Sequence, residues 1–281
     1  MTLQQMVTIP FMQRALVGLL VAGATFPILG VLIVNLNLQV IRFALMHVGL
    51  LGGAVALVVG FDPLLGGIGG IAAASLLLGP VADRTRVNTP AAAGLLMTGS
   101  LAAAFILFYK TGIPAMQAFD LFAGSVLMLR RQDVLLTVAL AAVILIAVIR
   151  WYRDVQIVLF DSRLAVALGV PETAIRYVLL TMVGLAIALA IRLVGALLLD
   201  ALFLLPATAG LRLGRNLGQA FLWSSGLGLV TAGGGVVLSV LWDLPIGASV
   251  AAVGVVVVGL SYPLELGLRK LRVQKGVGAN G

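Results

Sequence analysis

Long apolar stretches recur along the whole of this chain. A helix needs about 20 predominantly apolar residues to cross the hydrocarbon core of a bilayer. The apolar stretches predict nine membrane spans, at roughly residues 12–34, 40–59, 63–79, 91–109, 134–150, 175–191, 193–211, 217–240 and 246–265. Little more than Arg192 separates the sixth stretch from the seventh, so eight or ten spans also fit the pattern. The expected fold class is all-α: a polytopic transmembrane helical bundle of about nine spans.

The amino-acid composition excludes a water-soluble globule. Of the 281 residues, 62% are hydrophobic and only 10% are charged, whereas a soluble domain carries about 25% charged residues to face water. The chain has no cysteine, which excludes disulfides, thiolate metal sites and cysteine nucleophiles. His47 is the single histidine, so one copy cannot build a centre that needs two imidazoles.

The distribution of Lys and Arg predicts how the chain is oriented in the membrane. With the N-terminus outside, the inner loops hold 13 of the 18 basic residues, counting Arg42 among them. Basic residues favour the cytoplasmic side, so we expect the N-terminus outside, the C-terminus in the cytoplasm and an odd number of spans. The same bias explains the net charge of +8 without nucleic-acid binding.

Two connections are too long for simple turns. Residues 110–133 lie on the predicted outer side, and a short surface helix or a partly re-entrant stretch is expected there. Residues 151–174 lie inside and mix apolar with charged residues, which predicts a short amphipathic helix. Asp133 is expected to cap the fifth span, and residues from about 274 to 281 are expected to be a disordered tail of one transmembrane domain, residues 1–281. Glycine pairs such as Gly66/Gly70 allow either close packing or a homodimer seam.

The inner connection carries a resemblance to a known family. FDSRLAVALGVP, residues 160–171, resembles the cytoplasmic coupling segment of the metal-uptake ABC permeases, the zinc, manganese and iron branch of the bacterial importers. Members typically read F-D-P-E-x-A-x-A-x-G-V at this place. Ser162 and Arg163 replace the usual Pro-Glu, while Phe160, Asp161 and Gly169 are kept.

Four further stretches agree with that family in order and spacing. They are FMQRALVGLLVAG (11–23), FALMHVGLLGGAVAL (43–57), LFAGSVLMLRRQDVL (121–135) and RLVGALLLDALFLLPATAG (192–210). The resemblance implies a type II importer permease in which two copies form the pathway in the bacterial plasma membrane. It also implies two cytoplasmic ATPase subunits, an extracytoplasmic solute-binding protein, and docking through Asp161, Gly169, Pro171 and Glu172 of a coupling segment at about 157–173.

ATP chemistry is expected on a separate chain. The sequence has no G-x-x-x-x-G-K-[ST] phosphate loop, so we expect a transport subunit with no bound cofactor of its own apart from the transported metal ion. An intramembrane enzyme is disfavoured because the chain lacks H-E-x-x-H and a paired serine and histidine. A secondary carrier or channel is the remaining alternative, although no internal repeat supports it.

Few polar residues lie deep within the predicted spans. His47 aligns with the histidine of the family's D-A-L-S-H stretch, but Phe43 stands where that stretch has its aspartate. Asp200 stands where the family usually has a small or hydroxyl residue. We therefore expect His47 and Asp200 to line the substrate pathway and to serve as the metal ligands. The alternatives are a helix-packing role for His47 and, for Asp200, a pair with Arg192 or a neutral carboxyl group. Phe43 keeps open a metal chelate, such as a siderophore or cobalamin-type complex, as the substrate.

Overall fold

The computed structural model describes residues 9–85, 89–112, 129–194 and 196–277. Side chains are described for these residues except at 64, 78–85, 89–90, 162, 192–194, 196–198, 200 and 268–277. The described helices are α2 (Pro10–Asn35), α3 (Gln39–Val59), α4 (Pro63–Thr85), α5 (Thr89–Thr111), α7 (Arg131–Arg150), α8 (Tyr152–Phe160), α9 (Ser162–Ala167), α10 (Glu172–Val194), α11 (Ala196–Leu213), α12 (Leu217–Trp242) and α13 (Ile246–Val277).

Each predicted span coincides with one long helix. Seven described helices are long and apolar enough to cross a bilayer, while the searched parts of α4 and α11 form two shorter apolar helices, Leu65–Leu77 and Ala201–Leu213. The all-helical bundle is therefore confirmed, with a span count near nine. The predicted stretch at residues 110–133 lies largely outside the described residues.

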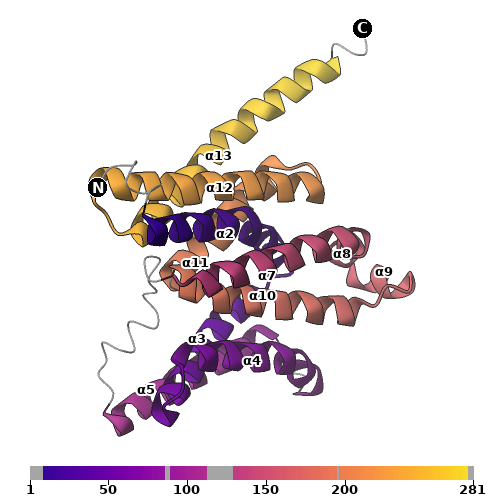
Figure 1. Ribbon diagram of the computed structural model, residues 1–281. Helices are drawn as coiled ribbons and strands as arrows, with labels where there is room; N and C mark the ends of the chain where they lie inside the picture. The colour runs from indigo at the N-terminus through magenta and orange to yellow at the C-terminus, as the bar shows by residue number, and fades with distance from the viewer. Residues whose placement is uncertain (1–8, 86–88, 113–128, 195, 278–281) are drawn as a thin grey trace.

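The helix α2 forms the centre of the bundle (Figure 1). It packs against α7, α10, α11 and α12, and its residues Ala22, Phe26 and Leu29 have no exposed surface. The helices α3, α4 and α5 form a second group, which α10 joins to the first through its contacts with α4. The helix α13 lies against α11 and α12 at its beginning and then extends away from the bundle (Figure 1).

Glycines bring several of these helices into close contact within one chain. A Cβ on Gly66 would collide with Gly52 and Ala56 of α3, and Gly70 lies against Val48 of the same helix. The absence of side chains lets two helix backbones approach closely. The Gly66/Gly70 pair therefore packs α4 against α3 within the subunit. Of the two predicted roles, close packing and a homodimer seam, the structure shows close packing.

Three local predictions change in detail. Arg42 is part of α3 and only 1% exposed, so its assignment to an inner loop was wrong; the excess of inner basic residues survives its removal from the count. Asp133 is the third residue of α7, and its carboxylate accepts a hydrogen bond from the Arg130 backbone N–H at 2.8 Å. It caps the helix from within. The helix α13 continues to Val277, beyond the predicted start of the tail, and residues 278–281 lie outside the described part.

Candidate functional site: the coupling segment and the open face of α3

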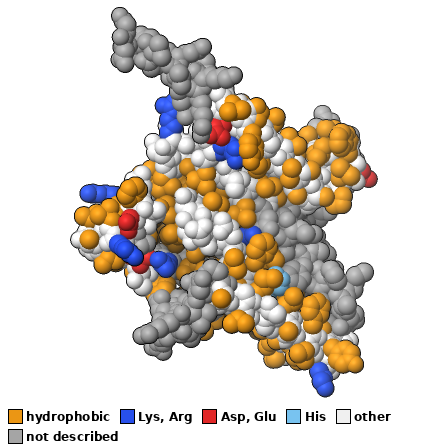
Figure 2. Space-filling view, turned by 180° about the vertical axis from the view of Figure 1, so that it is seen from behind, with side chains coloured by type: hydrophobic (Ala, Val, Ile, Leu, Met, Phe, Trp, Pro, Cys, Tyr) orange, Lys and Arg blue, Asp and Glu red, His pale blue; other side chains and the backbone are white. Residues whose placement is uncertain are grey.

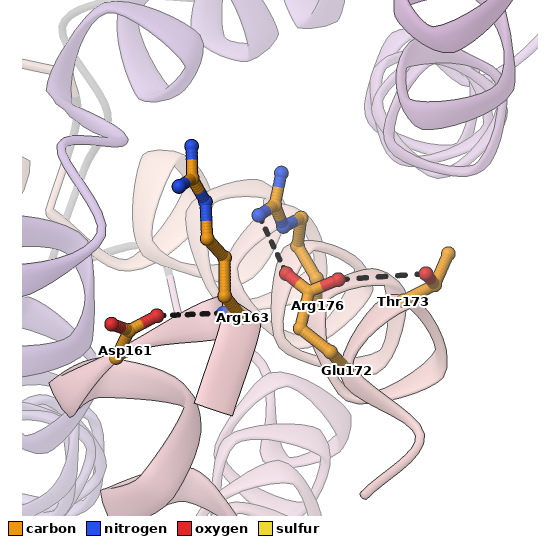
Figure 3. Close-up of polar contacts among 5 residues, drawn as sticks. All are labelled: Asp161, Arg163, Glu172, Thr173 and Arg176. Atoms are coloured by element: carbon orange, nitrogen blue, oxygen red, sulfur yellow. Dashed lines mark hydrogen bonds and ion pairs between the residues drawn. The ribbon is translucent and has the colours of Figure 1, made fainter. Parts of the chain in front are cut away.

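The coupling segment, residues 157–173, consists of the end of α8, the whole of α9 and a turn into α10 (Figure 1). Asp161 is the residue between α8 and α9. Its carboxylate accepts a hydrogen bond from the backbone N–H group of Arg163 at 2.7 Å (Figure 3) and another from that of Leu164 at 3.3 Å. An aspartate at this position satisfies N–H groups that a helix start leaves without intrahelical acceptors. Asp161 thus starts α9 and redirects the chain after α8.

The turn after α9 requires a glycine. Gly169 has a φ of +74°, a left-handed conformation that costs little for glycine and much for a branched side chain. Its N–H and that of Val170 donate to Val166 O and Ala165 O, which closes the end of α9. Pro171 then precedes α10, and Glu172, the first residue of α10, forms an ion pair with Arg176 one turn later (Figure 3).

The coupling segment exposes large apolar side chains at its surface. Phe160 is 83% exposed, and Val166 and Leu168 are also largely exposed. Charged side chains gather at the same end of the molecule, at the left of Figure 2. An apolar ridge with charged neighbours is a surface suited to contact with another protein.

A groove of about 560 Å³ separates α8 and α9 from the turn between α11 and α12. Its lining comes from the end of α2, from α8 and α9, and from that turn: Asn35, Gln156, Ile157, Leu159, Phe160, Leu164, Leu211, Gly214, Arg215, Asn216, Leu217 and Ala220. Parts of five helices, α2, α8, α9, α11 and α12, and one turn therefore meet at this end of the bundle.

The second candidate region is a strip of α3 whose side chains keep exposed surface. We call it the open face of α3: Val40, Phe43, His47, Leu51 and Val55, which recur every three or four residues and are half-buried or exposed. The one histidine side chain, pale blue, is visible at the surface in Figure 2. The opposite face packs on α4, α5 and α10.

His47 has a defined ring orientation on this face. Its Nδ1 lies 2.7 Å from the backbone oxygen of Phe43, and since a carbonyl can only accept, Nδ1 carries the proton. In the neutral imidazole the lone pair then lies on Nε2, which is how a metal-binding histidine is commonly held. The phenyl ring of Phe43 is 37% exposed, and the guanidinium of the buried Arg42 lies 4.4 Å from its centroid.

The predicted roles of Asp200 and Arg192 stay untested. Asp200 lies in α11 and Arg192 in α10, but both side chains are outside the described part of the structure. Among the described residues, no group of three or more His, Cys, Asp or Glu side chains could hold a metal ion. A cation at His47 therefore needs ligands from Asp200, from a second copy or from its own chelator.

The sequence did not predict two side-chain clusters that the structure shows. Tyr152, at the start of α8, packs against Phe221 of α12. Arg212 at the end of α11 lies over the ring of Tyr262 of α13, 3.4 Å from its centroid, and 3.5 Å from Glu265 Oε2. Both clusters join residues far apart in the chain, so no local pattern in the sequence indicated them.

Comparison with known proteins places the chain among transporters of one kind. Over 258 residues it is 25% identical to the manganese transport system membrane protein MntC of Halalkalibacterium halodurans, covering 92% of this chain and 88% of that protein. It is 23% identical over 252 residues to the manganese import system permease protein ScaB of Streptococcus parasanguinis, covering 90% of each.

Solved structures share the fold. The PsaBC structure from Streptococcus pneumoniae in complex with Fab has a TM-score of 0.79 at 22% identity, over 93% of this chain and 95% of that one. An inward-facing ABC transporter described as metal-chelate type has a TM-score of 0.69 at 18% identity, over 92% and 87%. The model of the ABC 3 transport family matches residues 8–262. The chain is a membrane permease that belongs to the ABC 3 transport family.

Proposed function

We propose that this chain is the membrane-spanning subunit of an ATP-driven importer for a divalent transition metal ion. Two copies form the pathway, two cytoplasmic ATPase subunits dock on their coupling segments, and an external solute-binding protein delivers the substrate. The observation that carries the proposal is the coupling segment itself: a capped, turned helix pair that exposes Phe160, Val166 and Leu168 to water. A cytoplasmic partner would bury this ridge.

Manganese is the foremost candidate among the metals. The relatives reported above carry the names of manganese transport proteins, while zinc and iron also accept imidazole and carboxylate ligands. Within each copy, His47 contributes Nε2 to the pathway and Asp200 contributes its carboxylate. Together they offer one nitrogen and one carboxylate ligand per subunit, and the ion passes between the two copies by alternating access.

The orientation follows from the same proposal. The coupling segment and the turn between α11 and α12 lie at one end of the bundle, which we assign to the cytoplasm of a bacterial cell. The N-terminus is then outside and the C-terminus inside the plasma membrane. Because the chain has no cysteine, Arg163→Cys and Lys110→Cys variants can be labelled with an impermeant maleimide; the proposal requires labelling of position 110, and not 163, from outside intact cells.

A metal chelate is the second candidate substrate, and Phe43 is the observation that favours it. The open face of α3 presents an exposed benzyl ring one turn before His47, where the family pattern has an aspartate. An aromatic ring stacks on organic ligands and offers nothing to a bare dication in place of the lost carboxylate. Arg42, stacked on that ring, adds a positive charge beside it.

Reconstitution distinguishes these candidates. The chain is placed in proteoliposomes with its ATPase and binding protein, and ATP-dependent uptake of manganese, zinc, iron and an iron–siderophore is measured separately. The test variants are His47→Ala and Asp200→Asn, with Val40→Ala on the same face and the exposed Asp243→Asn as matched controls. We expect uptake of free manganese that both test variants abolish and both controls retain. Uptake of the chelate alone would replace the free ion with the second candidate, and no ATP-dependent uptake of any substrate would refute the importer.

A further inference from the structure

Tyr152 joins the start of α8 to the start of α12. Its ring packs edge-on against Phe221, with centroids 6.4 Å apart and planes inclined by 67°, a favourable aromatic geometry. Its hydroxyl accepts a hydrogen bond from Gln156 Nε2 at 3.1 Å. Gly218 lies directly beside that hydroxyl: a Cβ at this residue would be 2.9 Å from Tyr152 Oη and 3.7 Å from Cζ. The ring of Tyr152 therefore rests on a position of α12 that has no side chain.

Beyond Tyr152 the two helices separate. Gln156 and Phe160 of α8 line one side of the 560 Å³ groove, and Arg215 and Leu217 line the other. The helix α8 has nine residues, about 13 Å at a rise of 1.5 Å per residue. Val155 and Val158 bury one face of α8 in the bundle. The helix contacts α12 through Tyr152 at its first residue, and Phe160 at its last residue is exposed beside the groove.

The start of α12 is in turn packed into the bundle. Phe221 is 7% exposed and Ser224 is fully buried. Gly210 of α11 leaves the room that Ser224 occupies, and Gly228 lies against Gly23 of the central helix α2. Close-packed interiors transmit displacements because they have no voids to absorb them. A shift at Phe221 therefore reaches both α11 and α2.

We propose that Tyr152 is a positioning residue that transmits the movement of the coupling segment to α12. The inference rests on the function proposed above, in which the ATPases move the coupling segment. When they push on α9, the segment shifts, the width of the groove changes, and the ring of Tyr152 carries the displacement to Phe221. The bundle then follows through α11 and α2. Tyr152 touches no substrate; its role is to keep ATP hydrolysis linked to the opening of the pathway.

A suppressor experiment isolates this contact. The number of metal ions taken up per ATP hydrolysed is measured for wild type, Gly218→Ala, Tyr152→Phe and the double variant in the complete importer. We expect Gly218→Ala to lower this ratio by about three- to tenfold, as a displaced coupling contact does, because its Cβ forces the hydroxyl away. Tyr152→Phe retains the ring and stays within about twofold of wild type. The double variant should return to within about twofold of the wild-type ratio. Without the hydroxyl, the new Cβ meets only Cζ of the ring, at 3.7 Å.

Gly226→Ala is the matched control, because a Cβ at this α12 glycine meets no atom within 4 Å; it should leave the ratio unchanged. Tyr152→Ala should lower the ratio while the amount of assembled complex in detergent stays the same. Equal ratios in Gly218→Ala and wild type, or no recovery in the double variant, would overturn the proposal. If the Tyr152→Ala complex does not assemble, the comparison of Gly218→Ala, Tyr152→Phe and the double variant still tests the proposal.

A second readout separates this inference from the proposed function. Cysteines at Gln156 and Arg215, on opposite sides of the groove, carry spin labels, and their distance is measured with and without ATP in the assembled complex. We expect an ATP-dependent change in wild type, a smaller one in Gly218→Ala, and recovery in the Gly218→Ala/Tyr152→Phe variant. This result would stand even if no metal were transported, in which case only the substrate proposal falls. A constant distance in wild type would refute the proposed movement of the coupling segment.

Discussion

The coupling segment and the open face of α3 are both surfaces without a covering helix, but they are built by different means. The side-chain hydrogen bonds and the ion pair that shape the turns of the coupling segment are local: Asp161 bonds to residues two and three positions later, and Glu172 pairs with a residue four positions later. The face of α3 depends on distant packing, because α4, α5 and α10 decide which of its side chains are covered. Arg42 is buried and Phe43, its neighbour, is exposed only for that reason.

The difference shows which region tolerates change. A segment held by local contacts keeps its form when the rest of the sequence varies, and this one keeps the family's Phe160, Asp161 and Gly169. A face defined by packing can alter its chemistry with one substitution, as Phe43 in place of the family's aspartate does. Under the proposed function, we expect docking to an ATPase to be the constant part of this permease and the α3 face to select its substrate.

The largest expected effect concerns two arginines, one from each region. Arg42 is 1% exposed within α3, whereas Arg163 is exposed at the start of α9. Arg42→Ala should lower the free energy of unfolding by about 3 kcal/mol, because it leaves a cavity and removes the guanidinium that stacks on Phe43. Arg163→Ala should change it by less than about 0.5 kcal/mol. Thermal and denaturant unfolding in detergent measure the free energy of unfolding of both variants. An equal loss of stability in the two variants would contradict the difference between the regions.

The next effect compares two glycines with positive φ. Gly169 has a φ of +74° in the coupling segment and Gly112 a φ of +68° after α5, and a Cβ at either meets no atom within 4 Å. Valine at either position carries a similar backbone strain of about 1–3 kcal/mol. We expect Gly169→Val to reduce ATP-dependent uptake at least about tenfold and Gly112→Val to leave it nearly unchanged. Comparable uptake by both variants would remove the coupling role from residues 157–173.

A third prediction sharpens the α3 face. Phe43→Asp places the family's carboxylate one turn before His47, so that two ligands converge on one ion. If the substrate is a free ion, the KM for manganese uptake should fall by about two- to tenfold, with Val40→Asp as a control for added charge. A loss of siderophore uptake with no gain for manganese would instead identify the chelate as the substrate.

The smallest effect concerns the cap of α9. Asp161→Ala removes the acceptor of two backbone N–H groups, which should cost about 1 kcal/mol locally. Asp161→Asn keeps an acceptor and serves as the control. Hydrogen exchange at residues 162–167 should increase in the alanine variant only, while the exchange of α3 stays the same. Faster exchange in α3 would show that the two regions are not independent.

The amino-acid sequence by itself determined the helices and the local turns of this protein. Spans are readable because the thickness of a bilayer sets their length and composition. The Asp161 cap and the Gly169 turn are local as well, since they act within a few residues, but they divide residues 151–174 into two helices where only one was predicted. Tertiary structure alone decided that Arg42 is buried, that Gly66 lies against Gly52, and that Tyr152 meets Phe221. Contacts between residues far apart in the chain depend on which helix faces pack together, and apolar periodicity does not specify that choice when nearly every face is apolar.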